Sequence, residues 1–185
     1  MGTHILDEQV IIAGFGGQGV MMMGKLLAHA GMIEHRHVSW LPSYGPEMRG
    51  GTANCHVIVS EEQIGSPVIA ESTAVIAMNL PSLDKFEPVV QPGGRLLINS
   101  SLVEKTATRT DVSILNIPVN DMANRQGSLR VANMVMLGAY IALSHVVRKE
   151  TILEALREVL GQTKQHLREI NVRALEEGIA FATTS

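Results

Sequence analysis

Residues 10–20 read VIIAGFGGQGV, an apolar run that passes directly into a glycine-rich turn. A short run of this kind is typical of a buried strand in a parallel sheet. Residues 20–29 then follow a helical pattern, and we expect Gly31 to end that helix. Strand, glycine turn and helix together predict the first unit of an α/β fold.

The rest of the chain continues this alternation. Five more apolar segments bounded by turn residues predict strands, at residues 37–41, 52–59, 73–78, 95–99 and 112–118. Helices are expected at residues 83–89, 129–147, 151–160 and 166–182. The helix over residues 129–147 is long and apolar, and we expect Gly138 within it to permit close packing. The pattern predicts an α/β fold with a doubly wound, mostly parallel sheet, a Rossmann-like three-layer sandwich in a single domain over residues 1–185.

The composition limits the classes of function. The single cysteine, Cys55, allows neither an internal disulfide nor an iron–sulfur cluster held by this chain alone, and a small buried core residue is the expected role. A net charge of −3 disfavours nucleic acid as a partner. No apolar run reaches the roughly 18 residues of a membrane span, and no secretory signal is present, so we expect a cytoplasmic protein. His35 and His37 have no clear third ligand, so no metal site is predicted.

The glycine-rich turn matches the pattern G-x-G-x-x-G between a strand and a helix. We expect Gly14 to permit the tight turn, Gly16 to let a ligand or another backbone approach, and Gly19 to let the helix pack on the strand. Free backbone N–H groups at the start of the helix can receive an anion. The candidate binding residues are Gly14, Gly16, Gly17, Gln18 and Gly19.

A dinucleotide site would need an acidic residue at the end of the second strand, about 20 residues further on. That region reads Ser39-Trp40-Leu41-Pro42 and contains no acid. No Lys-Ser/Thr pair follows the glycines, which excludes a nucleoside-triphosphate P-loop. The turn is therefore interpreted either as an anion or coenzyme A site or as a structural turn that packs a helix against the sheet.

A second loop follows the expected second strand, at the same edge of the sheet as the glycine turn, where doubly wound proteins bind ligands. Turn residues, an aromatic residue and an acid–base pair are concentrated there, which favours an interface or an active-site cover over a solvated surface loop. The candidate residues are Tyr44, Gly45, Pro46, Glu47, Met48, Arg49 and Gly50.

The two loops together resemble the gamma subunit of 2-oxoacid:ferredoxin oxidoreductases. The motifs that carry the resemblance are GFGGQGV at residues 14–20 and SYGPEMRGG at residues 43–51. Further similarities lie at Ser66-Pro67, Ala77-Met78-Asn79, Asn99-Ser100, Asn133 and Leu137-Gly138-Ala139, so the resemblance covers about residues 10–178.

The resemblance implies a non-catalytic subunit of an enzyme that oxidatively decarboxylates a 2-oxoacid to acyl-CoA and CO2 and reduces ferredoxin. In that family thiamine diphosphate, Mg²⁺ and the iron–sulfur clusters are held by other subunits, so this chain is expected to bind none of them. The implied partners are the alpha, beta and ferredoxin-like delta subunits, with ferredoxin as electron acceptor of the complex. Overall resemblance favours 2-oxoglutarate as the substrate, with pyruvate and branched-chain 2-oxoacids still open.

Two other classes of function stay open on the sequence alone. One is a stand-alone Rossmann-type nucleotide-binding oxidoreductase that uses the glycine turn, which the missing acid disfavours. The other is an interaction module without a link to catalysis. Binding of NAD, NADP or FAD would identify the first, and the proteins that purify with the chain would identify the second.

Overall fold

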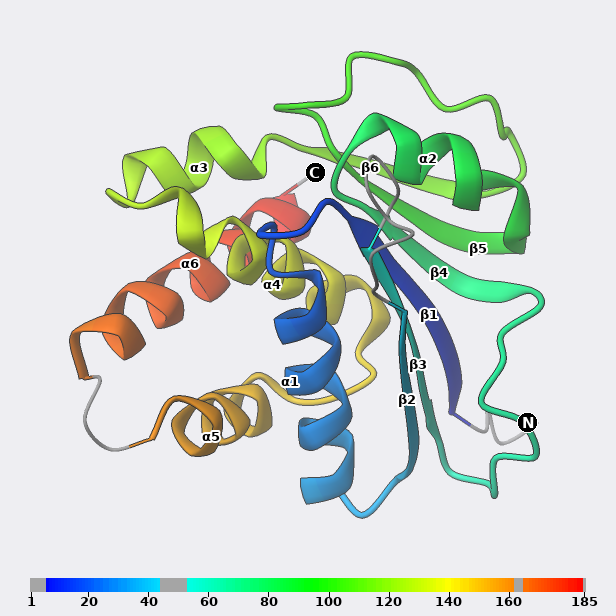
Figure 1. The fold of residues 1–185 in the computed structure, drawn as a ribbon, viewed down its shortest axis with the longest axis horizontal. Coiled ribbons are helices and arrows are strands. Elements are labelled where there is room, and N and C mark those ends of the chain that lie inside the picture. The colour runs from blue at the N-terminus through cyan, green and yellow to red at the C-terminus, as the bar shows by residue number, and fades with distance from the viewer. Residues whose placement is uncertain (1–5, 44–52, 162–164, 185) are drawn as a thin grey trace.

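The computed structural model describes residues 6–43, 53–161 and 165–184. Six strands form one twisted sheet in the order β2-β3-β1-β4-β5-β6 (Figure 1). The strands are β1 Asp7–Gly14, β2 His37–Ser43, β3 Ala53–Ser60, β4 Ser72–Ala77, β5 Val90–Asn99 and β6 Ser113–Ile117.

The sheet is mostly parallel, as predicted. The pairs β1/β4, β4/β5 and β5/β6 are parallel. β3 lies between β1 and β2 and is antiparallel to both, so β2 points in the same direction as β1. A parallel pair needs a crossover of a dozen or more residues, and the connection from Ser43 to Ala53 is too short for one. β2 and β3 therefore form a hairpin within an otherwise doubly wound arrangement.

Helices cover both faces of the sheet, which gives the three layers (Figure 1). The larger layer holds α1 Val20–Ile33, α4 Ala132–Ser144, α5 Lys149–Leu160 and α6 Gln165–Thr184. The smaller layer holds α2 Leu80–Phe86 and the 3₁₀ turn η2 Glu87–Val89. The connection from β6 to α4 runs through α3 Val119–Arg125 and the 3₁₀ turn η3 Leu129–Val131.

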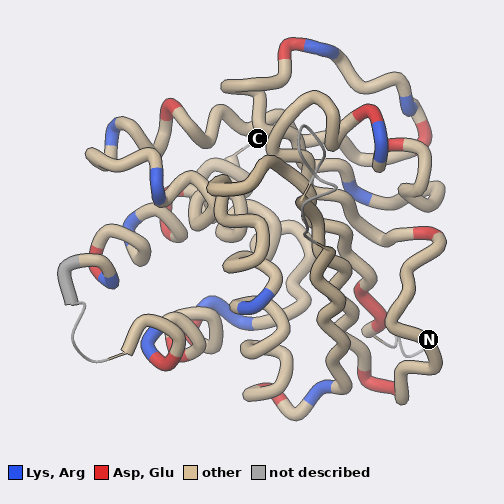
Figure 2. The backbone as a smooth tube through the Cα atoms, in the orientation of Figure 1, with Lys and Arg blue, Asp and Glu red and all other residues tan. Residues whose placement is uncertain are grey.

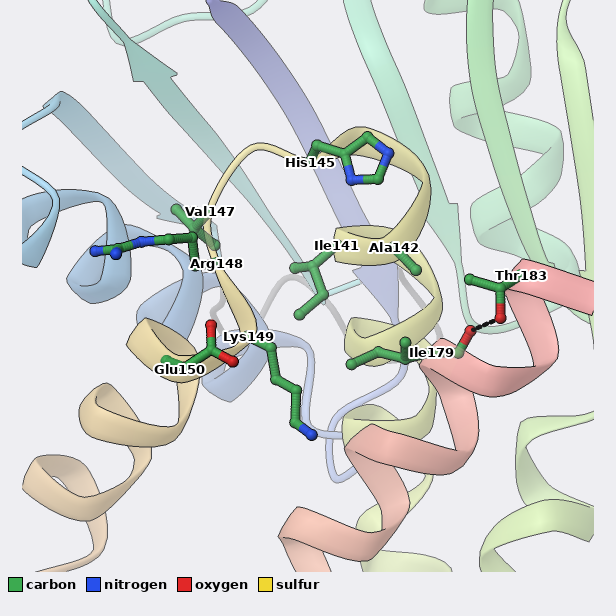
Figure 3. A pocket seen from close by; sticks show the side chains of 9 residues that line it. All are labelled: Ile141, Ala142, His145, Val147, Arg148, Lys149, Glu150, Ile179 and Thr183. Carbon is green, nitrogen blue, oxygen red and sulfur yellow. Dashed lines mark hydrogen bonds between the residues drawn. The ribbon is translucent and has the colours of Figure 1, made fainter.

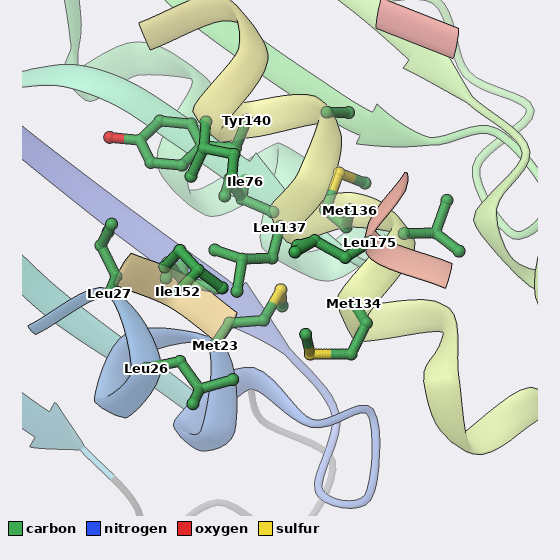
Figure 4. Close-up of a cluster of buried hydrophobic side chains, with 14 of the residues drawn as sticks. Met23, Leu26, Leu27, Ile76, Met134, Met136, Leu137, Tyr140, Ile152 and Leu175 are labelled. Carbon is green, nitrogen blue, oxygen red and sulfur yellow. The ribbon is translucent and has the colours of Figure 1, made fainter. Parts of the chain in front are cut away.

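The main core lies between the sheet and the larger helical layer (Figure 4). It is built from aliphatic and methionine side chains, because the chain has few aromatic residues. Figure 4 shows Met23 of α1 pointing toward Met134 and Leu137 of α4, with Leu26 and Leu27 of α1 in the same cluster. Dense packing of this kind fixes the start of α1, and with it the glycine turn, against the sheet.

Within the larger helical layer, α6 packs mainly on α4 rather than on the sheet. Two glycines permit the close crossing: a Cβ at Gly138 would lie 2.0 Å from the carbonyl oxygen of Leu175, and a Cβ at Gly178 would lie 1.9 Å from that of Val135. The prediction that Gly138 permits close packing is confirmed. The sequence pattern did not identify Gly178 as its counterpart.

Several helix ends differ from the prediction. α1 continues through Gly31 to Ile33, because Gly31 faces Val38 and Val59 rather than ending the helix. The chain then leaves the helix at His35, which has a positive φ of 59°. The predicted helix over residues 129–147 is divided into η3 and α4, and α3 was not predicted.

Candidate functional site

The carboxyl ends of β1, β2, β4 and β5 lie at one edge of the sheet, and the glycine turn follows β1 there. Gly14 pairs with Ala53 and Ser43 pairs with Asn54, so the two ends of the second loop flank the glycine turn. This agrees with the expectation that both loops share an edge. The predicted interface residues Tyr44–Gly50 lie outside the described residues.

The glycines of the turn have different roles from those expected. Gly14 packs the strand against the helix, because a Cβ there would lie 2.9 Å from Cγ2 of Val20, the first residue of α1, and 2.7 Å from Oε1 of Gln18. Gly19 has a positive φ of 76° and starts α1. A Cβ at Gly19 would lie 2.5 Å from Nδ2 of Asn133 on α4. The helix-to-strand packing assigned to Gly19 thus belongs to Gly14.

Gly16 and Gly17 form the exposed tip of the turn. A Cβ at either position would have no atom within 4 Å, but only Gly17 has a positive φ, of 91°. Gly16 therefore has neither a conformational nor a packing need for glycine within the described structure. Its backbone is open to a ligand or a partner chain, which is the role that the sequence pattern predicts.

The side chain of Gln18 ties the turn to the end of β4. Its Oε1 accepts hydrogen bonds from the backbone N–H of Phe15 at 2.6 Å and from Nδ2 of Asn79 at 3.1 Å. Its Nε2 donates to the carbonyl of Met78 at 3.1 Å. A partly buried amide that makes all three bonds fixes the shape of the turn before any ligand arrives.

Uncharged amides extend this network along the sheet edge. The carbonyl of Met78 also accepts from Nδ2 of Asn99, at 3.1 Å, and Asn99 donates to Oδ1 of Asn120 on α3 at 2.9 Å. Asn79 caps α2 by accepting from the backbone N–H of Ser82 at 2.9 Å. Asn79 and Asn99 belong to the sequence features that carry the family resemblance, and no role was predicted for them. Their role in the structure is to hold the loops after β4 and β5.

A cavity of about 520 Å³ opens beside the glycine turn, between the first turn of α1, the start of α4 and the start of α6. This volume is in the range of small-molecule sites. Its lining combines apolar side chains with a few polar groups. The lining residues are Gly19, Met22, Gly127, Ser128, Arg130, Val131, Asn133, Leu160, Leu167, Ile170 and Asn171.

Asn133 is the polar group of greatest interest in this cavity. Its side chain is buried, with the residue 6% exposed, and Nδ2 donates to the carbonyl of Gly19 at 3.5 Å. Its Oδ1 has no hydrogen-bond partner among the described residues. Arg130, at the cavity rim, is exposed and forms no ion pair with a described residue. The cavity therefore combines the exposed Arg130, which forms no ion pair with a described residue, with the buried amide of Asn133 and the N-terminus of α1.

The glycine turn and the first turn of α1 carry no ionisable side chain, since none occurs from residue 9 to residue 24 (Figure 2). Within the described residues there is no group of three or more His, Cys, Asp or Glu side chains that can hold a metal ion. Cys55 is 0% exposed, and burial raises the pKa of its thiol to about 12. The expectation that Cys55 is a small buried core residue is confirmed.

A second cavity, of about 380 Å³, lies toward the amino ends of the parallel strands, where α4 ends and α5 begins (Figure 3). Its two cationic side chains already have partners. Arg148 pairs with Glu34, and Lys149 pairs with Glu176 at 2.6 Å. In Figure 3 the side chain of Arg148 also points away from Ile141 on the apolar floor. The cavity beside the glycine turn is therefore the better candidate site.

None of the helices in the described part of the chain is both long and apolar enough to cross a membrane.

Residues 9–181 match the protein family described as pyruvate ferredoxin/flavodoxin oxidoreductase. The ketoisovalerate oxidoreductase subunit VorA of Methanothermobacter thermautotrophicus is 41% identical over 179 residues, which cover 95% of this chain and 36% of VorA. The 2-oxoglutarate synthase subunit KorC of Methanocaldococcus jannaschii is 30% identical over 180 residues, which cover 96% of this chain and 95% of KorC.

Among solved structures, the gamma subunit of a keto/oxoacid ferredoxin oxidoreductase from Geobacter sulfurreducens PCA has a TM-score of 0.83 and 29% sequence identity. The match covers 96% of this chain and 99% of that one. The lengths of the relatives differ: this chain spans 36% and 37% of two VorA relatives, but 95% of KorC.

Proposed function

The chain belongs to the pyruvate ferredoxin/flavodoxin oxidoreductase family, and we propose that it is the non-catalytic gamma subunit of a multi-subunit 2-oxoacid:ferredoxin oxidoreductase. The complex converts a 2-oxoacid and coenzyme A into acyl-CoA and CO2, and the two electrons released pass to ferredoxin. The match to KorC over nearly the whole length of both chains supports this assignment. We place the chain, a single domain over residues 1–185, in the cytoplasm.

We base the proposed roles of the subunits on the side chains at the carboxyl ends of the strands in this chain. Thiamine diphosphate with Mg²⁺ would supply the chemistry of decarboxylation, and iron–sulfur clusters would carry the electrons; both are assigned to the alpha, beta and ferredoxin-like delta subunits. The amide network around Gln18 and Asn99 contains no group that ionises near neutral pH. This chain shapes and covers a site rather than supplying an acid, a base or a nucleophile.

We further propose that the cavity beside the glycine turn holds part of coenzyme A. The observation that carries this proposal is that Arg130, which forms no ion pair with a described residue, lines the cavity together with Asn133, whose buried Oδ1 has no hydrogen-bond partner among the described residues. Coenzyme A combines anionic phosphates with an arm that contains amide N–H donors. The phosphates suit Arg130 and the N-terminus of α1, and a donor on the arm suits Asn133.

Exposed apolar side chains support an interface with a partner at the carboxyl ends of the strands. Phe15, Leu80 and Leu102 follow β1, β4 and β5 and are 42%, 39% and 48% exposed. Apolar residues gathered on successive loops are typical of a surface that a partner covers. With the residues from Tyr44 to Gly50, they form the proposed contact with the subunits that carry the active site.

2-Oxoglutarate is the proposed substrate, supported by the match to KorC over 95% of its length. Ketoisovalerate is the second candidate, favoured by the higher identity of 41% to part of VorA. Rates of ferredoxin reduction by the purified complex with each acid distinguish them. A preference for ketoisovalerate or pyruvate would overturn the assignment of 2-oxoglutarate and leave the subunit assignment intact.

The coenzyme A proposal is tested by titrating coenzyme A in the ferredoxin-linked assay of the assembled complex. Arg130→Ala removes an exposed cation that forms no ion pair with a described residue, so we expect normal folding and a rise in KM for coenzyme A of about tenfold, from the loss of one charge-assisted hydrogen bond. Arg173→Ala is the matched control, since Arg173 is exposed on α6 and does not line the cavity. An unchanged KM in Arg130→Ala would contradict the coenzyme A site.

A further inference from the structure

β6 forms one edge of the sheet and has an open side. It pairs with β5 from Arg95↔Ser113 to Asn99↔Ile117, and no described strand lies beyond it. The carbonyl of Ile117 accepts a hydrogen bond from the backbone N–H of Ser100, on the β5 side. Because backbone groups alternate in direction along a strand, those of Ile114 and Asn116 point outward, away from β5.

This edge lacks the features by which proteins normally protect an exposed strand. Edge strands commonly carry charged residues, prolines or bulges that prevent another chain from pairing. β6 reads SILNI and contains none of these, and Ile114 is 37% exposed. The opposite edge strand, β2, contains Pro42 near its end. The difference indicates that β6 is covered in the assembled protein, whereas β2 is protected by its own sequence.

A groove of about 260 Å³ runs beside β6, where the helical layer stops short of the last strand. Leu97, Leu115, Leu143 and Ala182 contribute its apolar lining. Among the described residues that line the groove, Arg95 alone is charged, and it already pairs with the buried Glu8 at 3.3 Å. A strand added to β6 would place every second side chain over this groove, and the groove matches uncharged, apolar side chains.

We propose that β6 receives an extended, uncharged segment of another subunit of the complex, which adds a seventh strand to the sheet. The open backbone groups of Ile114 and Asn116 match an extended chain as the occupant. The apolar groove matches apolar side chains on that added segment. A second copy of this chain is disfavoured, because a five-residue strand paired with itself buries far less than the roughly 1,200 Å² of a stable interface. The proposal concerns a different surface from the glycine turn and its cavity.

Hydrogen exchange in the isolated chain and in the purified complex tests this directly. The amides of Ile114 and Asn116 are expected to exchange at least about tenfold more slowly in the complex. Unchanged exchange at both amides in an active complex would overturn the strand addition without affecting the proposed function. If the same amides become protected from exchange in the isolated chain as its concentration rises, the occupant is a second copy of this chain. That result would also overturn the proposed addition of a strand from another subunit.

Two variants provide an independent readout. Asn116→Pro removes an outward N–H and leaves the ladder to β5, whereas the control Asn116→Ala keeps the N–H. Ile114→Lys adds a charge to the edge without changing the backbone. We expect Asn116→Pro and Ile114→Lys to weaken assembly by about tenfold or more and Asn116→Ala to assemble like the wild type. If Ile114→Lys folds and assembles with wild-type affinity, β6 is not a docking strand.

Discussion

Gly138 on α4 and Gly178 on α6 bring the two helices into backbone contact. A Cβ at either glycine would lie within 2.0 Å of a carbonyl oxygen on the other helix. Ala at either position therefore forces α6 away from α4, and we expect the free energy of unfolding to fall by about 2 kcal/mol or more. Urea unfolding measures the change. The control Gly65→Ala, where the added Cβ meets no atom within 4 Å, should change it by less than about 0.5 kcal/mol.

Gln18 is expected to control the rigidity of the glycine turn. Gln18→Met keeps the length of the side chain but removes the bonds to Phe15, Asn79 and Met78. We expect a loss of about 1–3 kcal/mol in unfolding free energy and a higher KM for coenzyme A in the complex. Gln63→Met, at an exposed position, is the control. Wild-type stability and a wild-type KM together would show that the turn keeps its shape without Gln18.

Cys55 is expected to be chemically inert in the folded protein. A thiol whose pKa burial has raised to about 12 is almost fully protonated near pH 8 and is shielded from reagents. Ellman's reagent should therefore react slowly with the native chain and give one thiol per chain in denaturant. Rapid reaction of the native chain would mean that β3 and α1 separate more readily than their packing implies.

Glu34 links the end of α1 to the start of α5. Burial alone would raise the pKa of Glu34, but hydrogen bonds from the backbone N–H of Arg148 at 2.8 Å and the hydroxyl of Thr151 at 2.7 Å hold it below its ordinary value of 4.5. A depressed carboxylate pKa contributes stability above the ordinary pKa, and that stability is lost as the pH falls through the folded-state pKa.

Glu34→Gln should therefore lower the free energy of unfolding at neutral pH by about 1 kcal/mol. The difference from wild type should narrow as the pH falls below 4.5, because Glu34 is protonated first in the unfolded chain and, at lower pH, in the folded protein as well. Glu154→Gln, at an exposed position on α5, is the control for the loss of charge. A difference that is the same at low and neutral pH would contradict the role of the ionised carboxylate.

The strands and their order along the chain could be predicted because each buried strand is a short apolar run between turn residues. The antiparallel position of β3 could not be predicted from that pattern, since burial on both faces gives the same apolar run in either direction. The resemblance placed the chain in the correct family from the two loop motifs, and the match of residues 9–181 confirms it.

The candidate site was predicted only in part. The glycine pattern located the turn, but it assigned the helix-to-strand packing to Gly19, because spacing alone does not show that α4 places Asn133 against that residue. The cavity combines segments near residues 19, 130 and 170, which come together only in the folded chain. Asn133 was noted by resemblance, and its unpartnered oxygen becomes visible only when its burial is known. The roles of Tyr44–Gly50 stay a prediction.

The most direct test of the central claim is to purify the tagged chain from its native host under anaerobic conditions and to assay what purifies with it. We expect a complex with larger subunits that reduces ferredoxin when both a 2-oxoacid and coenzyme A are supplied. We also expect that the chain, once separated, has no such activity and restores it when added back to the remaining subunits. A homogeneous chain that oxidises the 2-oxoacid alone, or remaining subunits that keep full activity without it, would contradict the account.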